Sequence, residues 1–404
     1  MKILVISYHT CPANKLGSKD SGGLNIYLRE ISEELGATGH KVDIFTRKHD
    51  LHDPLEIEMN GNSKVVHLDA GDLNHEKQQM HNFIDLFTEN LMNYINEQNL
   101  QYDLIYSNYW MSGMVGELIS EELKIPHIIT FHTMGLTKRT FSYLENESDF
   151  RIENELKLIN ASDAIIVPTY QEKENLILNY KTKNNIYIVS PGVDLDKFKS
   201  KNKFKSREKL KLSQTSKLLL SVGRLEPLKG YDVLIHALSF MNISDDFDVQ
   251  LLIIGGDSKS KKELERLNSL TRKHGLDKRV NFLGVVDHDE LPEYFSAADI
   301  FVMPSAHETF GIAALEASAC NLPVIAPQVG GLKSVIKHAQ TGFLSDSNRC
   351  PESLMHYLEI LLKNDPLREQ FGINSRSHAM NYSWEKSSKD LIEVFEDVLS
   401  KSLV

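Results

Sequence analysis

Short apolar runs alternate with amphipathic stretches along the first half of the chain. The runs have the length and composition of buried strands, and the stretches between them repeat their apolar residues at helical spacing. Strands are predicted at 3–7, 42–46, 65–68, 104–106, 127–131, 164–167 and 186–189, and helices at 25–35, 77–96 and 111–123. The repeated strand–helix–strand order favours a parallel sheet that is covered by helices on both faces.

A turn at Pro191-Gly-Val-Asp194 ends this series, and a basic stretch at 197–207 follows it. We interpret the basic stretch as a solvated linker that leads into a short helix, with a patch for anionic lipid headgroups as the alternative.

A second alternating series begins after the basic stretch. Its strands are predicted at 218–222, 249–254, 280–283, 300–303, 324–326 and 343–344, and its helices at 231–240, 261–274, 290–297, 312–320, 332–337 and from 351 to 403. The whole pattern indicates two doubly wound, Rossmann-like α/β domains. In such folds ligands bind beyond the carboxyl ends of the strands, so we expect the site in a cleft between the domains.

Length and charge restrict the class of protein. At 404 residues the chain exceeds the ~250–300 residues at which a single core stops growing. The net charge of −11 argues against a nucleic-acid binder that works by neutralising phosphates. The three cysteines, Cys11, Cys320 and Cys350, lie far apart, which favours reduced thiols in a cytoplasm. No apolar window approaches a membrane span, so we expect a soluble, cytoplasmic protein.

The first candidate site is a glycine pair at the start of the first predicted helix. Gly22 and Gly23 follow a long loop after the first strand. Glycines let backbone approach a ligand closely, and the free N–H groups of a helix start suit an anion. A plain helix-start turn is the alternative.

The second candidate is the loop that joins the first strand of the second series to its helix. It carries Arg224 and Lys229 between Gly223 and Gly230. Two cations in a loop bounded by glycines suit a diphosphate, whose charge must be neutralised by metal or side-chain cations. The alternative is a pair of surface charges on a turn.

The third candidate lies around the helix predicted at 312–320. Glu308 and Glu316 are separated by about 12 Å of helical rise, which is too far for the acid and nucleophile of a glycosidase. Separate roles along an extended ligand fit better. The alternatives are a first-turn charge for Glu308 and an exposed helix position for Glu316.

His132 ends a predicted strand and is a fourth candidate, with a structural histidine as the alternative. The chain contains no GxGxxG, no P-loop and no G-x-S-x-G elbow. Asp287-His-Asp289 is interpreted as helix N-capping rather than as a metal site.

In this order the motifs resemble the family 4 retaining glycosyltransferases of GT-B architecture over nearly the whole chain. The motifs that carry the resemblance are Gly22-Gly23-x-Asn25, Phe131-His132, Gly223-Arg224 with Lys229-Gly230, Glu308-x7-Glu316, Val329-Gly330-Gly331 and Tyr382-Ser-Trp384. The resemblance implies an N-terminal acceptor-binding domain at 1–195, joined by a returning helix at about 384–404, and a C-terminal nucleotide-sugar domain at 196–383.

The resemblance also implies roles for single residues. Arg224 and Lys229 would hold the donor diphosphate and stabilise its departure, and Glu316 would bind ribose hydroxyls. Glu308 and His132 would lie at the transferred sugar. The full donor side would comprise Gly22, Gly23, Arg224, Lys229, Phe310, Gly311, Ile312 and Glu316, with Phe310 and Gly311 as backbone donors. No metal and no other cofactor is expected, because the family is metal-independent and uses the nucleotide-sugar as a co-substrate.

On the acceptor side the chain is similar to two sub-groups, the inositol-phosphate N-acetylglucosaminyltransferases of the mycothiol pathway and the sucrose-phosphate synthases. Both transfer from a UDP-sugar to a small phosphorylated polyol or sugar. The resemblance implies an acceptor site made of Asn25, Lys77, Tyr109, Thr133 and Arg151. The chain departs from these sub-groups at Asn108, where they often carry a histidine. Alternatives are an ordinary surface charge for Arg151 and an aromatic core contact for Tyr109.

The leading hypothesis is therefore transfer of a hexosyl unit from a nucleotide-sugar, first a UDP-sugar, to a hydroxyl acceptor with retention. Alternatives are a transferase for a lipid-linked or cell-surface glycan, a nucleotide-sugar epimerase and a non-enzymatic nucleotide-sugar sensor. Peripheral membrane contact and a homodimer remain open, and no nucleic-acid partner is expected.

Overall fold

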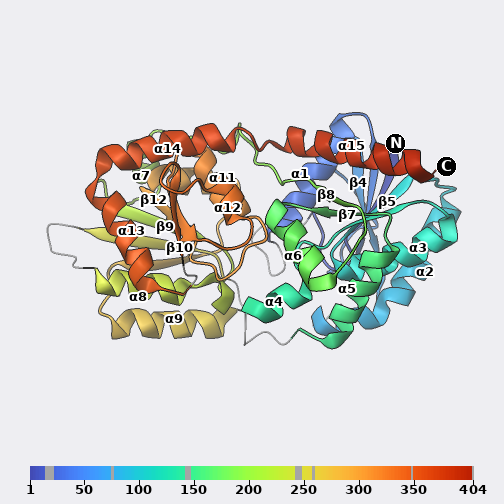
Figure 1. The fold of residues 1–404 in the computed structure, drawn as a ribbon, viewed down its shortest axis with the longest axis horizontal. Coiled ribbons are helices and arrows are strands. Elements are labelled where there is room, and N and C mark those ends of the chain that lie inside the picture. The colour runs from blue at the N-terminus through green and yellow to red at the C-terminus, as the bar shows by residue number, and fades with distance from the viewer. Residues whose placement is uncertain are drawn as a thin grey trace. The chain divides into compact units, whose positions relative to one another are not determined.

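The computed structural model describes residues 1–13, 22–73, 77–141, 147–241, 248–256, 260–346 and 349–402, and the side chains of residues 77, 78 and 141 are outside this description. The chain divides into two compact units (Figure 1). The first consists mainly of Gly23–Ser190, together with the start of the chain and Trp384–Val404, and the second mainly of Pro191–Ser383.

The first unit is a sheet in the order β3-β4-β2-β1-β5-β6-β7-β8. Its strands are β1 (Lys2–Ile6), β2 (Lys41–Arg47), β3 (Glu56–Glu58), β4 (Ser63–Leu68), β5 (Leu104–Asn108), β6 (His127–Thr130), β7 (Ala164–Val167) and β8 (Ile186–Ile188). Its helices are α1 (Gly23–Ala37), η1 (Lys77–Phe83), α2 (Ile84–Glu97), α3 (Trp110–Leu123), α4 (Gly135–Phe141), α5 (Asp149–Ala161), α6 (Tyr170–Tyr180) and α15 (Trp384–Ser402).

The second unit is a parallel sheet in the order β11-β10-β9-β12-β13-β14. Its strands are β9 (Lys217–Val222), β10 (Val249–Ile254), β11 (Val280–Gly284), β12 (Ile300–Val302), β13 (Val324–Pro327) and β14 (Gly342–Ser345). Its helices are α7 (Lys203–Lys209), η2 (Pro227–Lys229), α8 (Tyr231–Phe240), α9 (Lys261–Lys273), α10 (Leu291–Ala297), α11 (Ile312–Ala319), α12 (Leu332–Val335), α13 (Pro351–Lys363) and α14 (Asp365–Ala379).

The period of two along each strand places successive apolar residues on opposite faces of the sheet. On β9, Leu219 packs in one cluster with Leu234 of α8 and Leu358 of α13. The next residue, Leu220, packs in another cluster with Phe295 of α10 and Leu315 of α11. Both faces of the strand are therefore buried, which explains the continuous apolar run in its sequence.

Several element predictions need correction. The sheet of the first unit is not wholly parallel, because β3 pairs antiparallel with β4 at its edge. The helix predicted at 77–96 begins as the 3-10 helix η1, and α4 and α6 were not predicted. α10 is not capped by an aspartate, because its N-cap residue is Glu290 and no side chain caps the helix there. The second unit begins at Pro191, at the turn that ends the first series of predicted elements.

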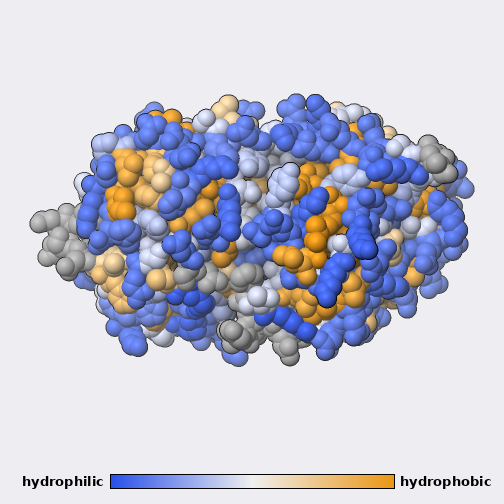
Figure 2. All heavy atoms as spheres, in the orientation of Figure 1, coloured by the Kyte–Doolittle hydropathy of each residue, from blue (hydrophilic) through white to orange (hydrophobic). Residues whose placement is uncertain are grey.

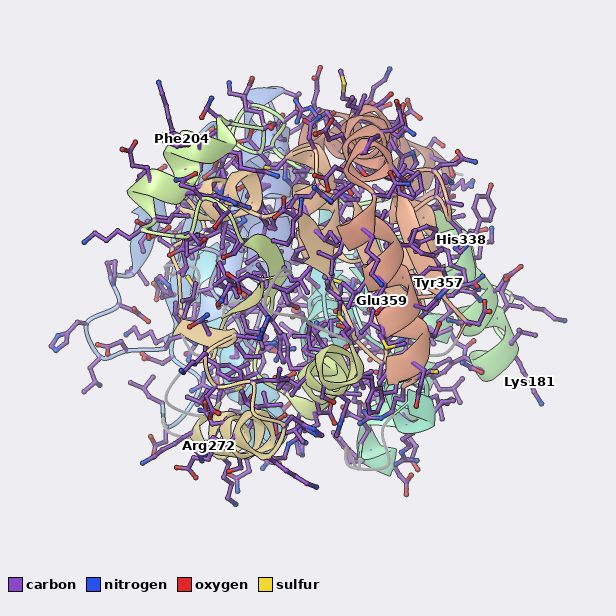
Figure 3. The ribbon with its side chains drawn as sticks, turned by 90° about the vertical axis from the view of Figure 1, so that its left-hand side faces the viewer. Lys181, Phe204, Arg272, His338, Tyr357 and Glu359 are labelled. Atoms are coloured by element: carbon purple, nitrogen blue, oxygen red, sulfur yellow. The ribbon has the colours of Figure 1, made fainter. Side chains whose placement is uncertain are left out.

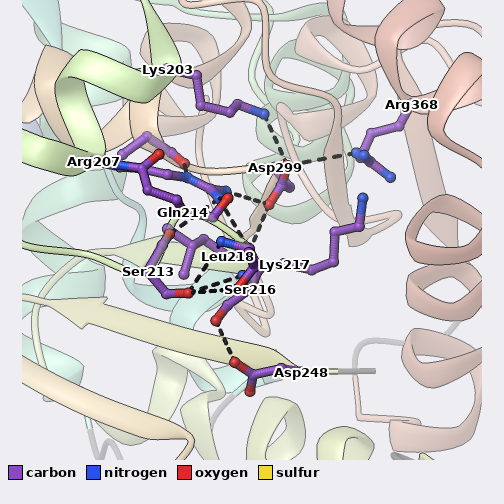
Figure 4. A network of polar contacts seen from close by, with 12 residues as sticks. Lys203, Arg207, Ser213, Gln214, Ser216, Lys217, Leu218, Asp248, Asp299 and Arg368 are labelled. Carbon is purple, nitrogen blue, oxygen red and sulfur yellow. Dashed lines mark hydrogen bonds and ion pairs between the residues drawn. The ribbon is translucent and has the colours of Figure 1, made fainter. Parts of the chain in front are cut away.

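The interpretation of the basic stretch as a solvated linker is wrong. Phe198 is almost fully buried, and Arg207 forms an ion pair with Asp299 at 2.8 Å. Lys203 pairs with the same aspartate at 2.9 Å (Figure 4). Lys201 pairs with Glu293 at 2.8 Å. The basic segment is therefore held by ion pairs to α10 and to Asp299, which follows α10. Phe204, which is labelled in Figure 3, is its exposed apolar side chain.

Apolar side chains are also exposed over the part of the first unit where α6 lies (Figure 2). Leu178 and Ile177 of α6 are among the exposed large apolar residues. Among the described residues, no helix combines the length and the apolar character needed to cross a bilayer.

Asp299 allows a test of how the basic segment is held. Burial raises the pKa of Asp299, but Lys203, the backbone N–H of Leu218 and Arg207 together hold that pKa below its usual range. Asp299→Asn leaves buried Arg207 without its counter-charge, so we expect it to lower the free energy of unfolding by about 3–5 kcal/mol. The measurement is urea unfolding at pH 7, in which Glu293→Gln, whose lysine partners are more exposed, should cost about 1 kcal/mol or less.

The pH dependence gives a second readout of the same variant. Because the folded-state pKa of Asp299 is depressed, its contribution is present above the unfolded-state pKa and is lost as pH falls through the folded-state value. Asp299→Asn should therefore destabilise the chain less at low pH than at pH 7. Equal costs for Asp299→Asn and Glu293→Gln at pH 7 would contradict the buried network.

Candidate active site

In the second unit, the loop after β9 brings Lys229 onto Glu308. Lys229 is the last residue of η2, and its Nζ donates to Glu308 Oε1 at 2.5 Å. The hydroxyl of Ser305 donates to the same oxygen at 2.8 Å. Gly230 ends η2 with φ of 67°, and a Cβ there would come within 2.1 Å of the Pro304 carbonyl oxygen. Only glycine lets the loop pack this closely on the segment that carries Glu308.

This packing fixes the charge of Glu308. Burial raises its pKa, but Lys229 and Ser305 outweigh burial and hold the pKa below its usual range. Glu308 is therefore a carboxylate at neutral pH. Lys229 keeps further N–H bonds for an anion, because an ammonium group has three donors.

Arg224 is the second cation of the loop and is 61% exposed. It pairs with Glu226 at 2.6 Å, and a pair so open to water is weak enough to be exchanged for another anion. The predicted cation pair thus lies on one loop, with Lys229 already oriented and Arg224 available.

The start of α11 lies beside this loop. Gly311 precedes the helix with φ of 98°, and no side chain caps it, so the first N–H groups of Ile312 and its neighbours remain for a ligand. The Val329-Gly330-Gly331 motif packs against the backbone of Glu308, in the segment that leads into α11. A Cβ on Gly330 would come within 1.9 Å of the Glu308 carbonyl oxygen, and the N–H of Gly331 donates to that oxygen at 2.9 Å.

Glu316, on α11, is buried, so its alternative as an exposed helix residue is wrong. His288 Nε2 lies 2.6 Å from Glu316 Oε1. The sequence prediction missed this histidine, although it stands between Asp287 and Asp289. Asp287 accepts a hydrogen bond from the backbone N–H of Asp289 at 3.0 Å instead of capping α10.

In the first unit, His132 follows β6 with φ of 61°. Its Nε2 lies 2.8 Å from Asn108 Oδ1, and its ring packs edge-on against Tyr27. An amide oxygen can only accept, so Nε2 carries the proton and Nδ1 is left as an acceptor. Burial lowers the pKa of His132 to about 3, so the ring is neutral near pH 7.

The predicted acceptor residues Tyr109, Thr133 and Arg151 come together. The Arg151 guanidinium lies over the Tyr109 ring, 5.0 Å from its centre, and Nη2 donates to Thr133 Oγ1 at 3.3 Å. Tyr109 follows β5 and precedes α3 with φ of 83°, which is strained for a bulky side chain and is typical of functional sites. Tyr109 is also part of the apolar core, so the two readings of this residue are compatible.

Arg151 is not a surface charge, because it is almost fully buried between two carboxylates. Its Nε donates to Glu155 Oε1 at 2.7 Å, and Nη1 pairs with Glu147 Oε2 at 2.9 Å. Glu155 also accepts the backbone N–H of Gly135, which gives it a structural role. Glu147 is partly exposed and also pairs with Lys138 at 3.1 Å.

The remaining predicted residues are less informative. Asn25 is buried, and its amide donates to the Cys11 carbonyl at 2.9 Å, which fixes the loop after β1. Gly23 is the first residue of α1, directly after Gly22. The side chain of Lys77 lies outside the described residues.

The second unit contains an apolar pocket of about 270 Å³ that the sequence prediction missed. Its lining residues lie near the carboxyl ends of β9, β10 and β11 and on α9: Leu225, Gly255, Gly256, Leu264, Phe282, Leu283 and Gly284. The sequence did contain a signal for this pocket, because Gly223 and Gly255 stand directly after β9 and β10. A Cβ on Gly255 would come within 1.9 Å of the Gly223 carbonyl oxygen, so this glycine lets the loops meet beside Arg224. Among the described residues, no group of three or more potential metal ligands is found.

Two family models match the chain. Residues 21–197 match the model described as Glycosyltransferase Family 4, and residues 202–378 match the one described as Glycosyl transferases group 1. The D-inositol 3-phosphate glycosyltransferase of Corynebacterium diphtheriae is 33% identical over 98% of this chain and 95% of its own length. That of Corynebacterium glutamicum is 32% identical over 100% of this chain and 98% of its own.

Solved structures agree with these matches. Sucrose-phosphate synthase from Thermosynechococcus elongatus superposes with a TM-score of 0.92 at 30% identity, over 99% of each chain. HepE from Anabaena, solved with UDP and glucose, superposes with a TM-score of 0.78 over 98% of this chain and 100% of its own. At 19% identity the second likeness shows the fold alone.

The environment of His132 can be tested by NMR. With a pKa of about 3, the His132 Hε1 resonance should keep a constant chemical shift between pH 8 and pH 5. In Asn108→Asp a carboxylate faces Nε2 and favours the charged ring, so the same resonance should titrate within that range. His132→Gln assigns the resonance by its loss. Titration of the wild-type resonance above pH 5 would contradict the assignment of a neutral ring.

Proposed function

We propose, on the premise that this chain belongs to glycosyltransferase family 4, that it moves a hexosyl unit from a nucleotide-sugar to a hydroxyl of a small phosphorylated polyol or sugar. We further propose that configuration is retained and that no metal takes part. The observation that carries the acceptor class is the Arg151 cluster in a chain similar over nearly its whole length to D-inositol 3-phosphate glycosyltransferases.

The donor half of the proposal rests on the second unit. Arg224, Lys229 and the start of α11 supply cations and N–H groups that suit a diphosphate. The apolar pocket beside Leu225 suits the flat faces of a nucleobase. UDP is the first nucleotide to test, because the sub-groups that the motifs resemble use UDP-sugars.

The proposed chemistry needs a leaving group that is stabilised as it departs. The acceptor oxygen bonds to the anomeric carbon on the face from which the bond to the diphosphate breaks. The electron pair of that bond goes to the diphosphate oxygen, and the acceptor proton moves to the departing phosphate. Lys229, held by Glu308, meets the charge that develops there. Neutral His132 offers Nδ1 to a sugar hydroxyl.

The acceptor part of the proposal requires a phosphate to replace a carboxylate at Arg151. Arg151 already faces Glu155 and Glu147, so a phosphate that binds it must compete with one of them. Glu147 is the partner that can yield, because it is more exposed and does not hold the backbone of Gly135. A neutral acceptor gains nothing from this exchange.

The glycan alternative at an anionic membrane loses its main support. Lys197, Lys201, Lys203, Arg207 and Lys209 all pair with acidic side chains of the second unit. The proposed compartment is a reducing one, since the three cysteines are thiols.

An acceptor panel tests the proposed function. UDP-sugars should be consumed with D-inositol 3-phosphate or hexose phosphates at rates at least ~10-fold above those with inositol or free hexoses, since a phosphate gains charge-assisted hydrogen bonds. Release of UDP is the readout, and NMR of the donor incubated alone detects an epimerase. Equal rates with phosphorylated and free acceptors would overturn the acceptor class.

Glu147→Gln sharpens the same test. Removing the competing carboxylate should lower KM for a phosphorylated acceptor several-fold and leave KM for the free polyol unchanged, since only the anion competes. Glu153→Gln, an exposed position on the nearby helix α5, is the matched control. An equal change with both acceptors would argue against competition at Arg151.

Lys229→Met tests whether Lys229 stabilises the departing diphosphate. The variant should lower kcat by about 100-fold or more while weakening UDP binding much less, because the diphosphate gains charge as the bond breaks. Isothermal titration with UDP and steady-state rates give the two values. Lys273→Met, on α9, is the control. Near-normal kcat in Lys229→Met would refute the role.

A further inference from the structure

His288 joins Glu316 to a lysine from a distant part of the chain. Its Nε2 lies 2.6 Å from Glu316 Oε1, and its Nδ1 lies 3.0 Å from Lys197 Nζ. His288 and Glu316 are both buried, and Lys197 also forms an ion pair with exposed Asp289. The three side chains come from the segment after Pro191, the loop before α10, and α11.

The arrangement sets the tautomer of His288. An ammonium group can only donate, so Nδ1 of the ring must accept from Lys197. The ring proton is then on Nε2, which donates to Glu316 Oε1. Lys197 thus ensures that the nitrogen facing the carboxylate, Nε2, is the one that carries the proton.

The ring also has a fixed orientation. Phe198, almost fully buried, packs against it with a centroid distance of 5.1 Å and packs in turn on Phe295 of α10. With Oε1 of Glu316 engaged by the ring, the rotation of the carboxylate is set. Its other oxygen, Oε2, has no hydrogen-bond partner among the described residues.

We propose that His288 and Lys197 are positioning residues that hold the Glu316 carboxylate so that Oε2 accepts from the vicinal hydroxyls of the donor ribose. The inference rests on the proposed function and on the role that the family resemblance implies for Glu316, binding of the ribose hydroxyls. His288 touches no substrate and acts through Glu316. Without His288 the carboxylate loses one hydrogen bond and its fixed plane, and it then selects ribose poorly.

The test compares two nucleotides. The probe is the nucleoside diphosphate, among UDP, GDP and ADP, that wild type binds most tightly, with its 2′,3′-dideoxy form as the partner ligand. By calorimetry, wild type should favour the ribose form by about 10-fold or more, the value of a hydrogen bond to a charged group. In His288→Leu the preference should fall to about that of Glu316→Gln.

Conservative variants separate positioning from folding. His288→Gln keeps a donor toward Glu316 and an acceptor toward Lys197, so it should preserve most of the ribose preference. Lys197→Met should lower the preference less than His288→Leu, because the ring remains but its tautomer is no longer imposed. His236→Leu, on α8, is the control and should keep the wild-type ratio. A purely structural role would weaken both nucleotides equally and leave the ratio unchanged.

The outcomes are distinguishable. A wild-type ribose preference that persists in His288→Leu but disappears in Glu316→Gln overturns the positioning role and leaves the proposed function intact. If wild type shows no ribose preference while transfer to a phosphorylated acceptor is measured, the inference fails alone. If wild type binds none of the three nucleotides, both the inference and the proposed function fail.

Discussion

In each unit the candidate site residues depend on where parallel strands end. In a parallel sheet all the carboxyl ends lie at one edge, so the residues that follow different strands are brought together without being neighbours in sequence. Asn108 ends β5, Tyr109 follows it, and His132 follows β6 in this way. In the second unit Arg224 follows β9. Of the glycines in the apolar pocket, Gly255 and Gly256 follow β10, and Gly284 ends β11. The sheet supplies the framework, and the loops supply the chemistry.

A second constraint is that buried charge must be balanced. In a chain of net charge −11, each important cation already faces a carboxylate: Lys229 faces Glu308, Arg151 faces Glu155, and Arg207 faces Asp299. The pairs differ in exposure, and this difference separates their roles. The Arg207 pair is closed to water and holds a segment in place, whereas Arg224 remains open to an incoming anion.

The alternation of strands and helices could be predicted from the sequence because buried parallel strands are continuous apolar runs. The predictions for α8 and β10 agree with the structure to the residue. β3 could not be predicted, because Glu56-Ile-Glu58 has one apolar residue and owes its conformation to pairing with β4. The basic segment was misread for a related reason. Its lysines look solvated in sequence, but the acidic partners of Lys201 and Lys203 lie 92 and 96 positions further along the chain.

For the candidate site, the sequence predicted the charged residues but not the side chains that each of them contacts. The proximity of Tyr109, Thr133 and Arg151 followed from their positions at strand ends and helix starts. His288 was missed because its significance is a distance to Glu316, 28 positions further along the chain. Glu147 was also missed, although it stands four residues before Arg151, a spacing that can indicate an ion pair. The roles of these residues in transfer remain predictions that the experiments above address.

The neutral ring of His132 bears on how the rate of the proposed reaction depends on pH. With a pKa of about 3, this histidine presents the same hydrogen-bonding groups in mildly acidic and mildly alkaline surroundings. The dianion of a phosphate monoester, in contrast, takes up a proton near pH 6 and becomes a monoanion. In the proposed reaction a fall in cellular pH would then act on the substrate, by halving the charge that Arg151 has to attract.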